Sequence, residues 1–137
     1  MTDSSSVGIV LSVHNGAVYL EEQVDSIRAQ THEEWRLWIR DDGSTDATAE
    51  LANRLATQDE RVSLVHDDAA RLGSGPSFGI LLQGLPGGVD YVFCCDADDV
   101  WFPDKIERSL DAMREAEAEG RGPLLVHSDL RVADSAF

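Results

Sequence analysis

The chain has 137 residues and a formal net charge of −15, with 42% apolar and 27% charged residues. This balance fits one globular domain with a sizeable core and argues against a mainly disordered chain. No basic stripe marks a nucleic-acid surface, and no apolar run reaches the roughly 20 residues that span a bilayer. Residues 1–6 lack the basic-then-apolar order of a secretory signal, so we expect a cytoplasmic protein that binds no nucleic acid.

Short apolar runs alternate with helix-like stretches along the chain, without internal repeats or a linker. The runs predict five strands, at residues 7–13, 35–39, 61–66, 89–95 and 124–127. Apolar residues spaced three or four apart predict four helices between them, at residues 17–30, 46–57, a short segment ending near 84, and 104–119.

This alternation predicts an α/β fold, with a mostly parallel sheet that carries helices on both faces. We treat residues 1–137 as a single domain of this kind. Ligands of such sheets bind at the carboxyl ends of the strands. Polar residues follow the expected strands at Asn15, residues 41–42, residues 96–99 and residues 128–129. We therefore expect these clusters to meet at one edge of the sheet.

The strongest chemical signal is the string Asp-Ala-Asp-Asp at residues 96–99. Three carboxylates this close repel one another unless a cation lies among them, and their hard oxygen atoms suit Mg²⁺ or Mn²⁺. A metal held there would bridge to substrate phosphates, which would let an acidic protein bind an anionic nucleotide. The alternative is a helix start, where the helix dipole and capping favour Asp. Asp99 and Asp104 fit that second role.

A second signal is the string Arg-Asp-Asp-Gly-Ser-Thr-Asp at residues 40–46. A tight turn with a Ser, Thr or Asp cap explains residues 44–46. It does not explain why Asp41 ends an apolar strand, so Asp41 is a candidate to accept hydrogen bonds from a ligand. His14 and Asn15 form a weaker signal, because Asn is also an ordinary turn residue.

Together these residues resemble family 2 glycosyltransferases with a GT-A fold, which has a Rossmann-like nucleotide-binding core. The likeness covers nearly the whole chain: residues 7–16 resemble the opening strand and turn, residues 41–46 a characteristic string, and residues 96–98 the Asp-x-Asp motif. Residues 96–106 are similar to the rhamnosyltransferase-like branch, although Ser77 replaces its usual Asn. The first helix carries the family's Leu, Ser, Ile and Gln at Leu20, Ser26, Ile27 and Gln30.

The resemblance implies a role for each matching residue. Asp41 would hydrogen-bond the base of the donor nucleotide. Asp96 would lie near the ribose or the metal, and Asp98 would be the main protein ligand of Mg²⁺ or Mn²⁺ on the donor diphosphate. The remaining residues that would line the nucleotide are Ser12, Val13, His14, Asn15 and Ala97. The implied reaction is inverting transfer of a sugar from a nucleotide-diphosphate donor to an acceptor hydroxyl, for a cell-envelope polysaccharide.

The resemblance also implies that residues 1–137 are the donor-binding half of a longer glycosyltransferase, truncated at the C-terminus. The general base and the site for a glycan or lipid-linked acceptor would then lie beyond residue 137. The longer protein would be cytoplasmic or peripheral to the membrane. A sheet deprived of its later strands would expose an edge through which the chain self-associates.

Three other functions remain open at this point. The pattern Asp-x-Asp-x-Val beginning at Asp96 is also that of haloacid-dehalogenase-like phosphatases, in which Asp96 would be the nucleophile. Their downstream acidic pair is not seen here, and the sole lysine, Lys105, is too near. A sugar-phosphate nucleotidyltransferase shares the core, but its Gly-rich, Arg-containing first loop is missing. The third alternative is a nucleotide-binding fragment without catalytic activity.

Overall fold

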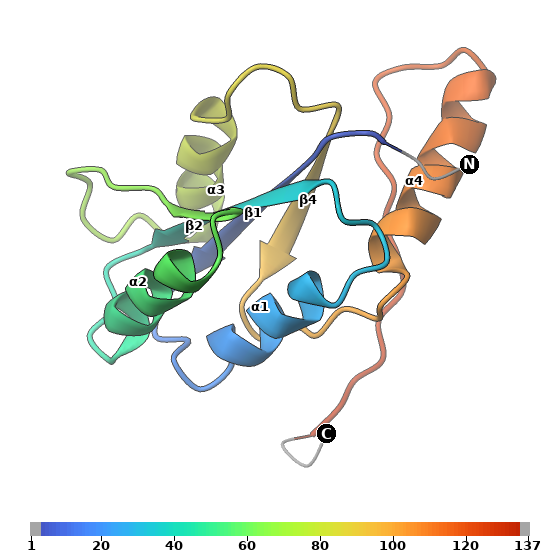
Figure 1. Cartoon of the computed structure of the whole chain (residues 1–137). Coiled ribbons are helices and arrows are strands. Elements are labelled where there is room, and N and C mark those ends of the chain that lie inside the picture. The colour runs from blue at the N-terminus through green and yellow to red at the C-terminus, as the bar shows by residue number, and fades with distance from the viewer. Residues whose placement is uncertain (1–3, 135–137) are drawn as a thin grey trace.

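Four parallel strands form one sheet in the computed structural model of the chain, which describes residues 4–134. The strands are β1 (Val7–Val13), β2 (Trp35–Asp41), β3 (Val62–Leu64) and β4 (Tyr91–Asp96), in the spatial order β3-β2-β1-β4. They alternate with helices α1 (Leu20–Arg28), α2 (Thr48–Gln58), α3 (Ser74–Gln83) and α4 (Lys105–Ala118) (Figure 1). The expected α/β fold with a parallel sheet is confirmed.

Helices cover both faces of this sheet, as the sequence predicts. Side chains alternate between the two faces of a strand, so Ile9 and Leu11 of β1 join one buried cluster with residues of α1, α2 and α4. Helix α3 packs against β1 and β2 from the opposite side (Figure 1), where Val10 and Leu81 are buried. Each fully buried Leu or Ile contributes about 1.5–3 kcal/mol relative to an exposed position.

Two expected strands differ from the structure at the edges of the sheet. Strand β3 is only three residues long, because its pairing with β2 is limited to Leu37–Ile39. Strand β4 is the other edge strand. Helix α3 packs against β1 and β2, and the side of β4 that carries Val92 and Cys94, called its outer face below, is less covered. Val92 is therefore 45% exposed and Cys94 is also exposed. The strand expected at residues 89–95 is therefore present, as Tyr91–Asp96, with one side partly open to solvent.

The expected fifth strand at residues 124–127 is also wrong, because this segment forms no ladder with the sheet within residues 4–134. It runs beside α4 (Figure 1), and the Lys105 Nζ donates to Ser128 Oγ at 2.9 Å. Leu125 is 88% exposed. Asp129 consequently does not join the other polar clusters at the end of a strand. Among the helices of the described chain, none combines the length and the apolar character needed to cross a membrane.

Candidate functional site

The carboxyl end of β1 lies between those of β2 and β4, which brings the predicted clusters together. In the strand register Ser12 is opposite Asp96, and Val13 is opposite Asp41. A hollow of about 260 Å³ opens beside β1. Its lining residues are Ser12, Val13, His14, Asn15, Gly16, Tyr19, Asp96, Ala97 and Asp98. Apart from Asp41, every residue that the sequence assigned to the nucleotide or the metal therefore lines one hollow.

Gly16 allows the close approach of backbone segments at this hollow. A Cβ atom on Gly16 would lie 2.6 Å from a methyl group of Val13 and 3.4 Å from the Cβ of Ala97. The Gly16 N–H donates to Thr48 Oγ1 at 3.0 Å, which ties the turn after β1 to the start of α2. A larger residue at this position would force the Val13 side chain or the turn to shift.

The acidic residues at the end of β4 are exposed and interact electrostatically. Asp96 is the last residue of the strand, and Asp96, Asp98 and Asp99 are all solvent-accessible. The pKa of Asp99 is raised above its ordinary value, first by burial and then by repulsion from Asp96 and Asp98. Lys105 opposes this increase. The cluster thus carries the unbalanced negative charge that a cation would relieve.

The donor atoms of this cluster fit a metal that is shared with a ligand. Within residues 4–134, no three acidic, histidine or cysteine side chains converge closely enough to hold a metal ion by themselves. Mg²⁺, however, is usually bound through one or two carboxylates together with water and substrate phosphates. Asp96 and Asp98, both in the wall of the hollow, provide carboxylates of that kind.

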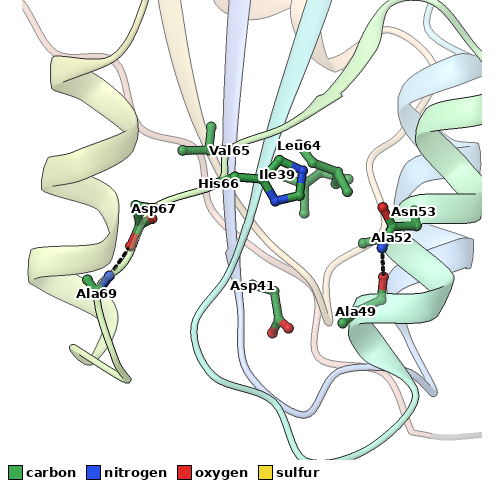
Figure 2. A pocket seen from close by; sticks show the side chains of 10 residues that line it. All are labelled: Ile39, Asp41, Ala49, Ala52, Asn53, Leu64, Val65, His66, Asp67 and Ala69. Carbon is green, nitrogen blue, oxygen red and sulfur yellow. Dashed lines mark hydrogen bonds between the residues drawn. The ribbon is translucent and has the colours of Figure 1, made fainter.

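Asp41 faces a separate hollow of about 180 Å³ on the other side of β2. Figure 2 shows its carboxylate below the His66 ring, between the Asp67–Ala69 loop and α2. The Ser44 N–H and hydroxyl both donate to Asp41 Oδ1. Asp41 Oδ2 accepts no hydrogen bond from the described part of the chain, so it is available to a ligand.

The neighbouring Asp42 is buried and bound to other protein groups. It accepts hydrogen bonds from Arg40 Nη1 at 2.7 Å, from the Leu72 N–H at 2.8 Å and from the Gly73 N–H at 2.9 Å. Burial acts to raise the pKa of Asp42, but these hydrogen bonds outweigh it and lower the pKa. Asp42 therefore links the residues before α3 to the end of β2 by hydrogen bonds.

Arg40 is 1% exposed and is the centre of a polar network that sequence reasoning missed. Besides Asp42, it binds Asp67 through two hydrogen bonds of 2.8 and 3.1 Å, and Ser77 Oγ at 2.8 Å. Ser77 Oγ in turn lies 2.5 Å from Ser12 Oγ. The network thus connects the lining of both hollows. The available signal was an arginine on the side of the strand opposite Trp35, Leu37 and Ile39, directly before two aspartates.

His14 and Asn15 line the first hollow, and both also form hydrogen bonds with the loop after β2. Asn15 has a positive φ of 50°, and its Oδ1 accepts from the Thr45 N–H at 2.8 Å. Its N–H donates to Ser44 Oγ at 2.8 Å. His14 Nδ1 lies 3.0 Å from the carbonyl oxygen of Asp42. These two residues brace the loop, a role the sequence analysis did not predict.

The sequence model described as Glycosyl transferase family 2 matches residues 8–128. The chain belongs to this family. It is 31% identical over 115 residues to an uncharacterized glycosyltransferase, alr2836, of Nostoc sp., covering 83% of this chain and 34% of that protein. It is 32% identical over 109 residues to TuaG of Bacillus subtilis, named as a teichuronic acid biosynthesis glycosyltransferase, covering 80% and 42% respectively. The chain thus spans well under half the length of these relatives.

Solved structures share the fold of this family 2 chain. TarS 1-349 of S. aureus, solved in complex with UDP-GlcNAc, superposes with a TM-score of 0.70 at 18% identity, over 82% of this chain and 32% of that one. The mannosyltransferase PcManGT of Pyrobaculum calidifontis, in complex with GDP-Man and Mn²⁺, gives 0.70 at 24% identity, over 80% and 32%. These similarities confirm the expected GT-A fold.

Proposed function

We propose that this chain binds the nucleotide-sugar donor of a glycosyltransferase, and that residues 1–137 form a single donor-binding domain. The observation that carries the proposal is the hollow at the carboxyl end of β1, where the turn after β1 meets Asp96 and Asp98. Membership of glycosyl transferase family 2 supports it. So do the nucleotide sugars bound to two proteins of the same fold.

In this proposal each part of the site has a separate task. Asp41, with one carboxylate oxygen that accepts no hydrogen bond from residues 4–134, accepts a hydrogen bond from an N–H group of the base. Residues 12–15 and Ala97 line the nucleotide. Asp98, assisted by Asp96, holds Mg²⁺ or Mn²⁺ against the donor diphosphate. When bound, the metal supplies positive charge that stabilises the departing nucleoside diphosphate.

The reaction that we propose is inverting transfer of the sugar. An acceptor hydroxyl loses its proton to a carboxylate and attacks the anomeric carbon, while the bond to the nucleoside diphosphate breaks on the opposite side. The carboxylate that takes this proton is not assigned to a residue of this chain. The hydrogen-bonded loops around Asn15 and Asp42 hold the donor side rigid, which lowers the cost of orienting the reacting groups.

The likeness of residues 96–106 to the rhamnosyltransferase-like branch and the names of the relatives suggest which product and acceptor the protein uses. We propose a cell-envelope polysaccharide as the product and a glycan or lipid-linked molecule as the acceptor. The name of TuaG, which refers to teichuronic acid biosynthesis, supports that assignment. We further propose that the whole protein works in the cytoplasm or at the membrane surface.

Calorimetric titration of the chain with UDP, dTDP, GDP and inorganic phosphate, each with Mn²⁺ and with EDTA, tests the proposal. We expect one nucleoside diphosphate to bind best and to bind more tightly with Mn²⁺. A phosphatase with Asp96 as its nucleophile instead predicts no base preference and release of phosphate from phosphate esters. Equal affinity for all three nucleotides, unchanged by the metal, would contradict the proposed function.

A further inference from the structure

Three buried polar side chains lie between α1 and the acidic loop, which we define as residues 97–106. Gln23 is 0% exposed, Ser26 is 9% exposed and Gln30 is 4% exposed. Such side chains are costly to bury unless their hydrogen bonds are satisfied. Their partners across the interface are backbone groups of the acidic loop, together with the side chains of Trp101 and of Cys95 in β4. The function described above gives these three residues no task.

Gln30, two residues beyond the end of α1, binds the acidic loop at two points. Its Nε2 donates to the Phe102 carbonyl at 2.7 Å, and its Oε1 accepts from the Ile106 N–H at 3.0 Å. The same Nε2 also donates to the Ser26 carbonyl at 3.2 Å. The amide therefore bridges the last part of the loop and the first turn of α4 to the end of α1.

Ser26 and Gln23 bind the part of the loop that follows Asp98. Ser26 Oγ accepts from the Trp101 N–H at 3.1 Å and donates to the Gln23 carbonyl at 2.6 Å. Gln23 satisfies both ends of its amide when Nε2 donates to the Asp99 carbonyl at 2.7 Å and Oε1 accepts from Trp101 Nε1 at 3.2 Å. Trp101 itself is 7% exposed and packs in the core.

The backbone is held by hydrogen bonds on both sides of Asp98. On one side, Asp96 belongs to β4 and is paired with Ser12 of β1. On the other side, the Asp99 carbonyl lies 2.7 Å from the Gln23 amide, which donates to it once the amide is oriented to satisfy both of its ends, and the Asp99 N–H approaches the Asp96 carbonyl at 3.4 Å. The exposed carboxylate of Asp98 thus stands on a backbone that is held from both ends, although no protein group binds the carboxylate itself within residues 4–134.

We propose that Gln23, Ser26 and Gln30 are positioning residues that hold the acidic loop in the geometry with which Asp98 binds the metal–diphosphate group. This inference rests on the proposed function. Groups that orient a metal ligand without touching the metal commonly change metal affinity by 10- to 100-fold when they are removed. The three residues act through the backbone of the loop and the Trp101 side chain, and within residues 4–134 none of them binds the Asp98 carboxylate.

The test compares Gln30→Met, which removes both hydrogen bonds to the acidic loop at similar volume, with Arg28→Met at the last residue of α1. Arg28 is a matched control because its bonds lead to Asp25, Asp59 and the Leu55 carbonyl, not to the acidic loop. The measured quantity is the ratio of affinities for the best-bound nucleoside diphosphate with Mn²⁺ and with EDTA. We expect Gln30→Met to lower this ratio by about 10- to 100-fold, and Arg28→Met to leave it unchanged.

Two further measurements separate positioning from general stability. Amide hydrogen exchange should become faster at Ile106 in Gln30→Met but not in Arg28→Met. Gln30→Glu places a carboxylate oxygen against the Phe102 and Ser26 carbonyls, so its affinity ratio should fall at least as far as that of Gln30→Met. If Gln30→Met does not fold, Ser26→Ala replaces it, with faster exchange expected at Trp101 and a reduced ratio.

The outcomes distinguish this inference from the proposed function. If the wild-type chain gains no affinity from Mn²⁺, the proposed function fails, and the inference is overturned with it. If wild type and Gln30→Met gain equally, only the inference is overturned. An equal loss in Gln30→Met and Arg28→Met would also overturn it, because a purely structural effect would then explain both variants.

Discussion

The carboxylates of Asp41 and Asp42 are adjacent in sequence but lie in opposite environments at the end of β2. Asp42 is 3% exposed and binds Arg40 and two backbone N–H groups at the start of α3. Asp41 lines a hollow and keeps one oxygen free of hydrogen bonds from residues 4–134. Asp42 therefore stabilises the fold, whereas Asp41 is available to a ligand. Because the side chains are identical, substituting each by Ala compares these two roles directly.

Asp42→Ala should destabilise the fold by about 3–5 kcal/mol, because it removes one of the two carboxylate partners of the buried Arg40 and also the acceptor of the Leu72 and Gly73 N–H groups. Asp41→Ala should change the free energy of unfolding by no more than about 1 kcal/mol, since it removes only local hydrogen bonds from Ser44. Urea unfolding of both variants measures the difference. Equal losses of stability would contradict the division of roles.

Asp41→Ala should weaken nucleoside diphosphate binding by about 10- to 150-fold. This range corresponds to the roughly 1.5–3 kcal/mol that a hydrogen bond to a charged group contributes. The ratio of affinities with and without Mn²⁺ should not change, because Asp41 and Asp98 line different hollows. Calorimetric titration of the variant measures both quantities. Unaltered nucleotide affinity would mean that Asp41 serves only the turn at Ser44.

Asp98→Asn should remove most of the dependence of nucleotide affinity on Mn²⁺. Its carboxylate is exposed, so the free energy of unfolding should change by less than about 0.5 kcal/mol. This combination excludes misfolding as the cause of lost affinity. Asp104→Asn, at the start of α4, is a matched control that also removes one exposed negative charge. If Asp98→Asn keeps the full metal response, Asp98 is not the principal ligand.

The stability of the chain should fall as the pH is lowered from about 5. The pKa of Asp67 is lowered by its hydrogen bond from Arg40, and that of Asp42 is lowered despite its burial. An aspartate whose pKa is below the unfolded value of about 3.9 stabilises the fold above that value. The stabilisation is lost as the pH falls through the folded pKa.

Urea unfolding between pH 7 and pH 3 measures this dependence. Asp67→Asn should be less stable than wild type at pH 7, and the difference between the two should shrink toward pH 3. Asp68→Asn is the control, because the hydrogen bonds of Arg40 lead to Asp42, Asp67 and Ser77 and not to this exposed neighbour. A difference between wild type and Asp67→Asn that stays constant with pH would contradict the Arg40–Asp67 contribution.

The sequence was informative where function depends on short motifs and uninformative where structure depends on distant partners. Asp41, Asp96 and Asp98 could be singled out because carboxylates directly after apolar strands have few structural explanations. The parallel sheet then predicted correctly that residues following β1 and β4 would meet. The Arg40 network was missed because Asp67 and Ser77, its partners, are 27 and 37 positions away.

The prediction of a strand at residues 124–127 failed for the same reason, because the pairing of a strand depends on residues that are distant in the sequence. Apolar and β-branched residues favour a strand, but the stability of a strand depends on the neighbours with which it pairs. This segment lies beside α4 and makes no ladder with the described sheet. The family positions Ser26 and Gln30 illustrate the converse case. Their residue types were noticed from the resemblance, and only the structure showed that they bind the acidic loop.

The uncovered side of β4 leads to a last prediction, that the chain self-associates at high concentration. Strand β4 has a partner on one edge only within residues 4–134, and Val92 on its outer face is 45% exposed. An unpaired edge beside exposed apolar side chains is a template for pairing with another chain. Light scattering during gel filtration should therefore show a mass that rises with protein concentration.

Val92→Lys should suppress this association, because a charge on the outer face of an edge strand opposes pairing with a second sheet. Val18→Lys is the control, since Val18 is 83% exposed in the segment before α1 and lies outside the sheet. The two variants carry the same change in net charge, so a general effect of charge on solubility would appear in both. A monomeric mass for wild type at every concentration, or equal suppression by both variants, would show that the β4 edge does not drive association.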